Sequence, residues 1–267
     1  MNTLKTALIL FFAITVTACS GTRSVTTPLT DREMVVDGSL SGWSLDESVI
    51  ERTDIANYYA THDNNFLYLF IDVQSPGHNN AMRQSGFIIY ISDNEDNRKQ
   101  TGIAFPSGSF NLLRENPGAY NSFVNDPEWG QNPRNRELLQ NLEEDIFDRI
   151  MVVEQSSSGT DRGFINRDQL QIDGIQIAAE EGRRMMSIEL RVPLNQSSIY
   201  NIHGDRIWVG FEIDPPNFRR QDNSNQMQQQ QRYGGQRRAS QSADNRRSNI
   251  RQRMGQFERW YRLDLGQ

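Results

Sequence analysis

Two runs of sequence decide the fold, NFLYLFIDV at residues 65–73 and GFIIYIS at residues 86–92. Both are short, rich in β-branched and aromatic residues, and bounded by Asn, Asp or Gly, a pattern typical of β-strands. In the first run, Leu67, Leu69 and Ile71 occupy alternate positions and therefore fall on one face of a strand. The two runs predict strands that each place a face in a hydrophobic core.

Similar runs recur along the chain and predict five further strands, at 150–154, 169–178, 185–192, 207–213 and 257–265. Seven or more short strands separated by turn residues favour a mainly β fold, an antiparallel β-sandwich of the immunoglobulin-like or jelly-roll kind.

One segment has the period of a helix instead. The apolar residues of 133–147 recur at helical spacing and predict a single amphipathic helix. It lies in an insertion at about 107–149 that is otherwise rich in Asn, Pro and Gly. An insertion of this size between strands more often serves a function than a plain turn does.

A second unusual segment, 219–253, consists mostly of Asn, Gln, Arg and Ser. Because it has almost nothing apolar to bury, we expect a disordered loop. Its nine arginines and two aspartates give a net charge of +7, whereas the whole sequence carries −6. Two interpretations stay open: a solvated insertion that folds back on the acidic body, or an arm that binds a polyanion or a protein partner. We expect no nucleic-acid partner.

The start of the sequence has the layout of a signal peptide. Lys5 precedes an almost wholly apolar run at 6–16, and two small residues lead to Cys19, the only cysteine. This run is about half of the roughly 20 residues that cross a bilayer as a helix. We therefore predict a signal peptide at 1–18 that is removed.

Cys19 is the predicted site of lipid attachment, because a thiol is nucleophilic enough to accept an acyl-bearing group. The preceding residues 16–18 are similar to a bacterial lipobox, and Ser20 in place of Asp implies, by resemblance to lipoprotein sorting rules, the outer membrane. No acidic cluster follows Cys19, so we expect the protein to face the periplasm. The small polar residues of 19–30 predict a flexible tether. The rest, 31–267, is expected to form the sandwich domain.

Three motifs together resemble family 9 carbohydrate-binding modules and the related DOMON sandwiches. They are VVDGSLSGW at 35–43, ATHDNNFLYL at 60–69 and MSIELRVPL at 186–194, and their order and spacing agree along most of 33–215. The resemblance implies a β-sandwich that binds a carbohydrate and has no catalytic activity. Trp43 and Trp208 are interpreted as core residues of that scaffold.

Sugar binding needs an exposed aromatic face with polar side chains beside it. Trp129 lies in a loop context within the insertion and is the candidate, together with nearby Tyr120, Phe123, Asp126 and Glu128. The alternative is that Trp129 pins the long insertion onto the sandwich, as aromatic anchors often do. In that case Trp260 is the next candidate.

Other chemistry is not indicated. His62, His78 and His203 are far apart and have no second ligand at metal spacing, so we expect no metal site. Residues 93–97 lack the pattern of a calcium loop and predict a hairpin turn. No nucleophile motif occurs, and we expect neither enzymatic activity nor a cofactor. The sequence thus predicts a membrane-anchored binding module for a carbohydrate. The alternative is an envelope assembly or interaction lipoprotein that uses the sandwich as a scaffold.

Overall fold

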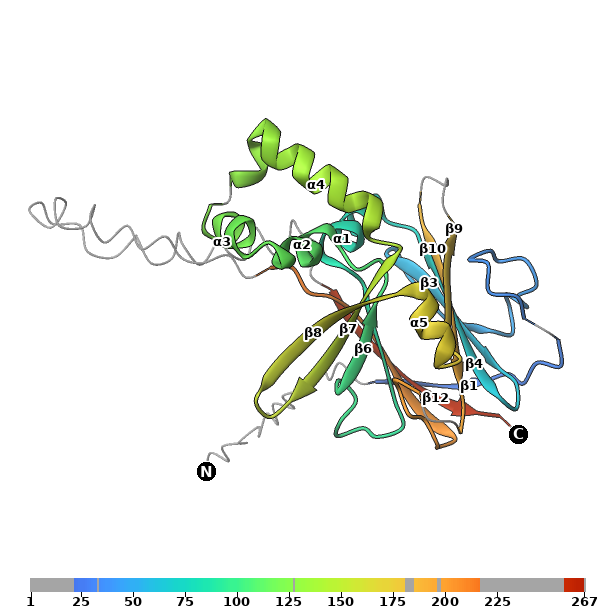
Figure 1. The fold of residues 1–267 in the computed structure, drawn as a ribbon. Coiled ribbons are helices and arrows are strands. Elements are labelled where there is room, and N and C mark those ends of the chain that lie inside the picture. Colours follow the sequence, from blue (N-terminus) through green and yellow to red (C-terminus); the bar gives the residue numbers. More distant parts are fainter. Residues whose placement is uncertain are drawn as a thin grey trace, which may run out of the picture.

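The computed structural model (Figure 1) describes residues 22–32, 34–126, 128–180, 185–195, 198–216 and 257–266. The predicted signal peptide, the lipid-attachment site Cys19 and the arginine-rich segment 219–253 lie outside these residues. Over the described part, the chain is mainly β and forms two sheets, which confirms the predicted sandwich class.

The larger sheet has seven strands. Their spatial order is β1 (Arg23–Thr27), β12 (Phe257–Leu265), β11 (Arg206–Ile213), β5 (Ile88–Ser92), β6 (Thr101–Ala104), β7 (Arg149–Ser156) and β8 (Gly159–Asn166). The smaller sheet has five, in the order β2 (Val49–Arg52), β3 (Ala56–His62), β4 (Phe66–Val73), β10 (Ser187–Pro193) and β9 (Gln176–Glu180). Neighbouring strands pair antiparallel, except that β1 runs parallel to β12.

The core forms between the sheets from alternate residues of each strand. Leu67, Leu69 and Ile71 of β4 have no exposed surface, as the alternation predicted, and Val209 of β11 packs into the same cluster from the other sheet. The intervening residues of β11 and β12 point away from this core. The outer face of the seven-stranded sheet therefore carries its own side chains, which matter for the site described below.

The helices are more numerous than predicted. They are α1 (Pro76–Ser85), α2 (Ser109–Leu112), η1 (Leu113–Glu115), α3 (Pro117–Asn125), η2 (Trp129–Gln131), α4 (Pro133–Asp145) and α5 (Arg167–Ile172). The predicted helix is present as α4. Figure 1 shows α2, α3 and α4 grouped together beside the sandwich. Helix α3 forms because Pro117 opens it and the Asn116 side chain caps it by accepting from the Ala119 amide.

Two predictions were wrong in part. The stretch 169–178 was expected to be one strand, but its first half belongs to α5, which Asn166 and Gln169 start through a capping box. The expected tether at 19–30 contains strand β1, because Arg23–Thr27 pairs with the free edge of β12. A short polar sequence can join a sheet through its backbone even when its side chains give no apolar signal.

Candidate functional site

The predicted site residues of the insertion do not form an open aromatic face. Trp129 is 8% exposed and packs with Phe123, whose ring centroid is 5.8 Å away, inside a separate small core. Tyr120 is half-buried beside Arg114, whose guanidinium lies 4.9 Å from the tyrosine ring centroid.

Asp126 and Glu128 are the exposed members of this set. They form the turn that leads to Trp129, in which Asp126 Oδ1 accepts from the Glu128 amide at 2.9 Å. The structure therefore brings the predicted residues together, but it fits the alternative role of Trp129 as an anchor of the insertion.

The tryptophan of the first sequence motif is a scaffold residue. Trp43 packs against Tyr59 and Phe70 on the outer face of the five-stranded sheet, and its Nε1 donates to Glu189 Oε1 at 2.9 Å. Glu189 is 0% exposed and also accepts from the amides of Asp37 and Gly38. Burial raises the pKa of Glu189, although these donors work against the shift. The first and third sequence motifs are thus tied together through one carboxylate.

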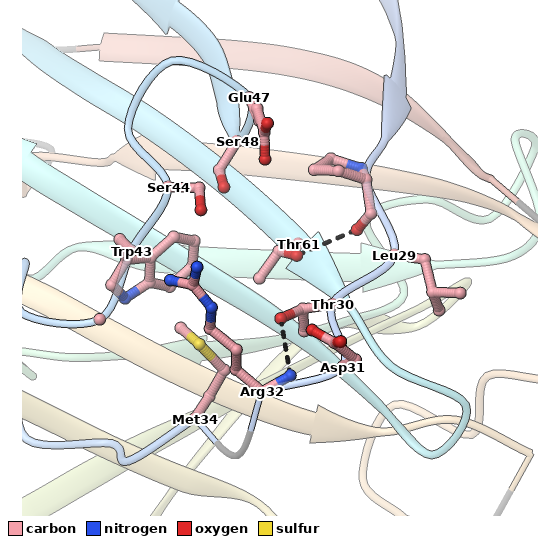
Figure 2. Close-up of a pocket in the computed structure, with 12 residues that line it drawn as sticks. Leu29, Thr30, Asp31, Arg32, Met34, Trp43, Ser44, Glu47, Ser48 and Thr61 are labelled. Atoms are coloured by element: carbon pink, nitrogen blue, oxygen red, sulfur yellow. Dashed lines mark hydrogen bonds between the residues drawn. The ribbon is translucent and has the colours of Figure 1, made fainter.

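A small pocket adjoins Trp43 (Figure 2). Figure 2 shows Ser44, Glu47 and Ser48 on one side of it and Asp31 and Arg32 on the other. Its volume is about 110 Å³, well below the roughly 300 to 1,000 Å³ of most ligand pockets. A polar space of this size suits ordered water molecules better than a sugar ring.

The outer face of the seven-stranded sheet carries a more open aromatic pair, Trp260 on β12 and Tyr90 on β5. The planes of the two rings differ by 24° and their centroids lie 5.9 Å apart. Gly210 of β11 lies between them in register, since it pairs with both residues. Tyr90 is 1% exposed, whereas Trp260 is only half-buried. Trp260 is thus the aromatic residue of this pair that a ligand could reach.

Two glycines allow these rings to lie flat on the sheet. A Cβ on Gly210 would come within 2.4 Å of the Trp260 ring, and a Cβ on Gly102, the partner of Tyr90 on β6, would come within 2.7 Å of the tyrosine. Real Cβ atoms are not found that close to other atoms, so each ring needs its glycine. The two rings therefore lie flat on the outer face of the sheet, which is the orientation in which an aromatic ring can stack on a sugar.

Charged side chains surround the aromatic pair. Lys99 Nζ lies 3.0 Å from Glu212 Oε2 and 3.0 Å from Glu258 Oε1, and 5.8 Å from the Tyr90 ring centroid. Glu258 also accepts from Trp260 Nε1 at 2.7 Å. One ammonium group thus holds two carboxylates against the edge of the platform.

The pKa values follow from this network. Burial alone would raise the pKa of Glu258, but hydrogen bonds from Trp260 and Lys99 outweigh it and hold the pKa below its ordinary value. Burial raises the pKa of Glu212, although the nearby Lys99 opposes the shift. Burial alone would lower the pKa of Lys99, but the carboxylates of Glu212 and Glu258 beside it raise that pKa overall. Glu258 is therefore the carboxylate that stays ionised most readily.

Arg98 covers the remaining face of Trp260. Its guanidinium carbon lies 4.7 Å from the indole centroid, and one of its Nη atoms donates to Thr22 Oγ1 at 3.3 Å. The sheet occupies one face of the indole at Gly210, so Arg98 occupies the other.

A polar cleft of about 370 Å³ borders the platform and shares Lys99 with it. All the residues that line it have polar side chains: Asp96, Asn97, Lys99, Gln100, Gln155, Ser156 and Ser157. Amide and hydroxyl groups of this kind can both donate and accept hydrogen bonds. The volume falls within the range of typical ligand pockets.

Clusters of metal ligands and membrane-spanning helices were looked for in the part of the chain that the structure describes. No three His, Cys, Asp or Glu side chains gather there in a way that could hold a metal ion. None of the helices described is long and apolar enough to span a bilayer. Residues 93–97 lie in the connection between β5 and β6, where Asp93 Oδ2 accepts from the His203 amide.

Most residues of this site carry no local signal in the sequence. Trp260 was named as the second candidate, but Tyr90 was interpreted only as part of a strand and Lys99, Glu212 and Glu258 were not considered. Gly102 and Gly210 are a signal that could have helped, because glycine inside a strand often marks close approach of another group. Which ring approaches them depends on the strand order.

Comparison with known protein families and with curated proteins finds no match for this chain. Among solved structures, two matches are to a carbohydrate-binding module of family 9 from Caldicellulosiruptor kristjanssonii. In complex with cellotriose, that module is 13% identical, covers 73% of this chain and 78% of its own, and gives a TM-score of 0.34. In complex with glucose, the module is 12% identical, the match covers 73% of this chain and 80% of the module, and the TM-score is 0.32. Nothing about the ligand of this chain follows from matches at this level.

Proposed function

We propose that this chain is a non-catalytic binding module that takes a carbohydrate on the outer face of its seven-stranded sheet, with Trp260 as the stacking residue. The observation that carries the proposal is the half-buried Trp260 ring, laid flat over Gly210 beside a polar cleft of about 370 Å³. The three sequence motifs that resemble family 9 modules support the same class of ligand.

The chemistry of the site suits a sugar. The C–H face of a pyranose packs on an aromatic ring, and its hydroxyl groups need partners that both donate and accept. Asn97, Gln100 and Gln155 provide amides at the cleft, and Ser156 and Ser157 provide hydroxyls. No covalent step is required of any of these groups, so the proposed role is binding alone.

We also propose that the module is anchored by lipid on Cys19 in the outer membrane, facing the periplasm. The support is the signal layout of residues 1–18 and the single cysteine that follows it. Strand β1 begins at Arg23, only four residues after Cys19. The anchored domain would then lie within about 14 Å of the membrane surface, since an extended chain spans at most roughly 3.6 Å per residue.

A glycan array tests the binding proposal. The wild-type protein is expected to retain a defined set of glycans that Trp260→Ala loses, with a loss of roughly 1 to 3 kcal/mol in binding free energy. Asn97→Ala, an exposed change in the cleft, should weaken the same glycans. Trp208→Phe, on the same face but buried, is the control and should keep them. An array without any bound glycan would reject the carbohydrate role and favour an envelope interaction role.

Labelling with a clickable palmitate analogue tests the anchor separately. The wild-type protein should take up the label in a Gram-negative host, and Cys19→Ser should not. Labelling that persists in the mutant would reject Cys19 as the attachment site. This result is independent of the array, because the platform lies in the described sandwich and not in the anchor.

A further inference from the structure

We propose that the glycan bound at Trp260 carries a protonated amino group, and that Arg98 holds the place of this cation in the unliganded protein. The inference rests on the proposed function and narrows its ligand to amino sugars with a free amine. It follows from two observations: the Arg98 guanidinium covers the Trp260 ring in the structure, and the charges of Glu212, Glu258 and Lys99 remain if that guanidinium moves away.

The stacking face of Trp260 is occupied in the resting structure. Gly210 lies against one face of the indole, and the Arg98 guanidinium covers the other with its carbon 4.7 Å from the ring centroid. A sugar ring that stacks on Trp260 must therefore displace Arg98. The structure itself thus shows that this face accepts a cation, because the π-system of an indole attracts positive charge.

The charges around the platform are unbalanced without Arg98. Glu212 and Glu258 share the single ammonium of Lys99, at 3.0 Å from each. Two carboxylates then face one ammonium, so the immediate surroundings of the ring carry a net charge of −1 once the guanidinium has moved away. A neutral sugar leaves that charge uncompensated, and an acidic sugar adds to it.

Arg98 is held loosely enough to be displaced. Within the described ranges its guanidinium has no carboxylate oxygen within 4.0 Å, and the one hydrogen bond of its side chain goes to the hydroxyl of Thr22 at 3.3 Å. Lys99, by contrast, is held by two carboxylates, each at 3.0 Å. An incoming ammonium group would replace the cation–π contact that the half-buried guanidinium gives up, so exchange of one cation for another on the ring costs little. A ligand amine beside Glu258 would restore both the contact and the charge balance.

The test compares two probes of equal length on the full chain, a deacetylated chitooligosaccharide and its N-acetylated form, by titration calorimetry. We expect the deacetylated form to bind at least about fivefold more tightly. Glu258→Gln should reduce that preference, whereas Glu144→Gln, an exposed acid on α4, should leave it unchanged. Arg98→Ala removes the competing cation and should raise affinity for the deacetylated form about two- to fivefold. Arg134→Ala, an exposed arginine on α4, should not.

Each outcome separates the two proposals. Equal binding of both probes, lost in Trp260→Ala, would overturn the amino-sugar inference and leave the sugar site standing. Two results would show a general attraction of a polycation to an acidic protein and would overturn the inference. One is that the deacetylated probe still binds more tightly in Trp260→Ala. The other is that Glu144→Gln weakens its binding as much as Glu258→Gln does. If neither probe binds while other glycans on the array do so through Trp260, the ligand class is wrong but the platform is right.

Discussion

The indole of Trp260 rests on Gly210, its antiparallel partner across β12 and β11, and a Cβ at that glycine would come within 2.4 Å of the ring. The flat orientation of the tryptophan is therefore a property of the pair. A glycine inside a strand lowers stability by about 1 kcal/mol relative to alanine. In this sheet the glycine makes room for a ring that would otherwise stand away from the surface.

The first prediction is that Gly210→Ala destabilises the protein and disturbs Trp260 together. The added methyl group has to push the ring aside, and overpacking of this kind costs about 1 to 3 kcal/mol. Thermal unfolding and the emission spectrum of the tryptophans measure the two effects. Gly163→Ala on β8 is the matched control, since nothing lies within 4 Å of its added Cβ. Equal losses at both positions would contradict the prediction.

Much of the sandwich could be predicted from the sequence because its strands carry strong local signals. The runs at 65–73, 207–213 and 257–265 correspond closely to β4, β11 and β12. Strands β1 and β8 gave no such signal, because they lie at the edges of the sheet and most of their residues are exposed. An edge strand is stabilised by backbone pairing, and its side chains need not be apolar.

The site was harder to predict than the fold because its parts are distant in sequence. Tyr90, Gly210 and Trp260 meet only through the strand order β5, β11, β12, which a single sequence does not reveal. In the insertion at about 107–149, by contrast, the local sequence suggested an exposed aromatic residue that the structure buries. Trp129 lies in a stretch rich in Asn, Pro and Gly that suggests an open loop, but several short helices enclose the ring. Asparagine and proline were signals of helix starts there, at Asn116 and Asn132.

The second prediction compares two tryptophans that are equally buried, both 7% exposed. Trp43 Nε1 donates to Glu189, whereas Trp208 Nε1 has no hydrogen-bond partner in the described structure. Trp43→Phe should therefore cost about 1 to 3 kcal/mol more than Trp208→Phe, since it leaves a buried carboxylate short of a donor. Urea unfolding of both variants measures the difference. Equal costs would show that the Trp43 hydrogen bond adds nothing to stability.

The third prediction concerns acid pH and Glu258. Its pKa in the folded protein lies below the ordinary value, because Trp260 and Lys99 outweigh the effect of burial. The unfolded chain thus binds the proton more readily, so this carboxylate stabilises the fold at pH values above the unfolded pKa of about 4.3. That contribution is lost as the pH falls through the folded pKa. Melting temperatures measured from pH 7 to pH 3 should fall less steeply in Glu258→Gln.

Glu212 should change stability with pH in the direction opposite to Glu258, and it therefore serves as the control for the third prediction. Burial raises its pKa, so the folded state holds the proton more tightly and the contribution of this residue to stability falls as the pH rises. Glu212→Gln should therefore relieve a destabilising effect near neutral pH, offset in part by the loss of its contact with Lys99. If both variants changed the acid limb in the same direction, the assignment of the ionised carboxylate to Glu258 would fail.

The last prediction returns to Trp129 and decides between the two interpretations that the sequence left open. The ring packs against Phe123 and belongs to the small core that joins α3 and α4, so Trp129→Ala creates a cavity where the helices meet. Such a change should destabilise the insertion by about 3 to 5 kcal/mol and leave glycan binding at Trp260 intact. Amide hydrogen exchange across α2 to α4 measures the first effect, and titration with a glycan from the array measures the second. Protection should be lost in the insertion before it is lost in the sandwich, because the cluster around Trp129 is separate from the main core. Unchanged exchange together with lost binding would place the sugar site in the insertion, with Asp126 and Glu128 as its polar side chains.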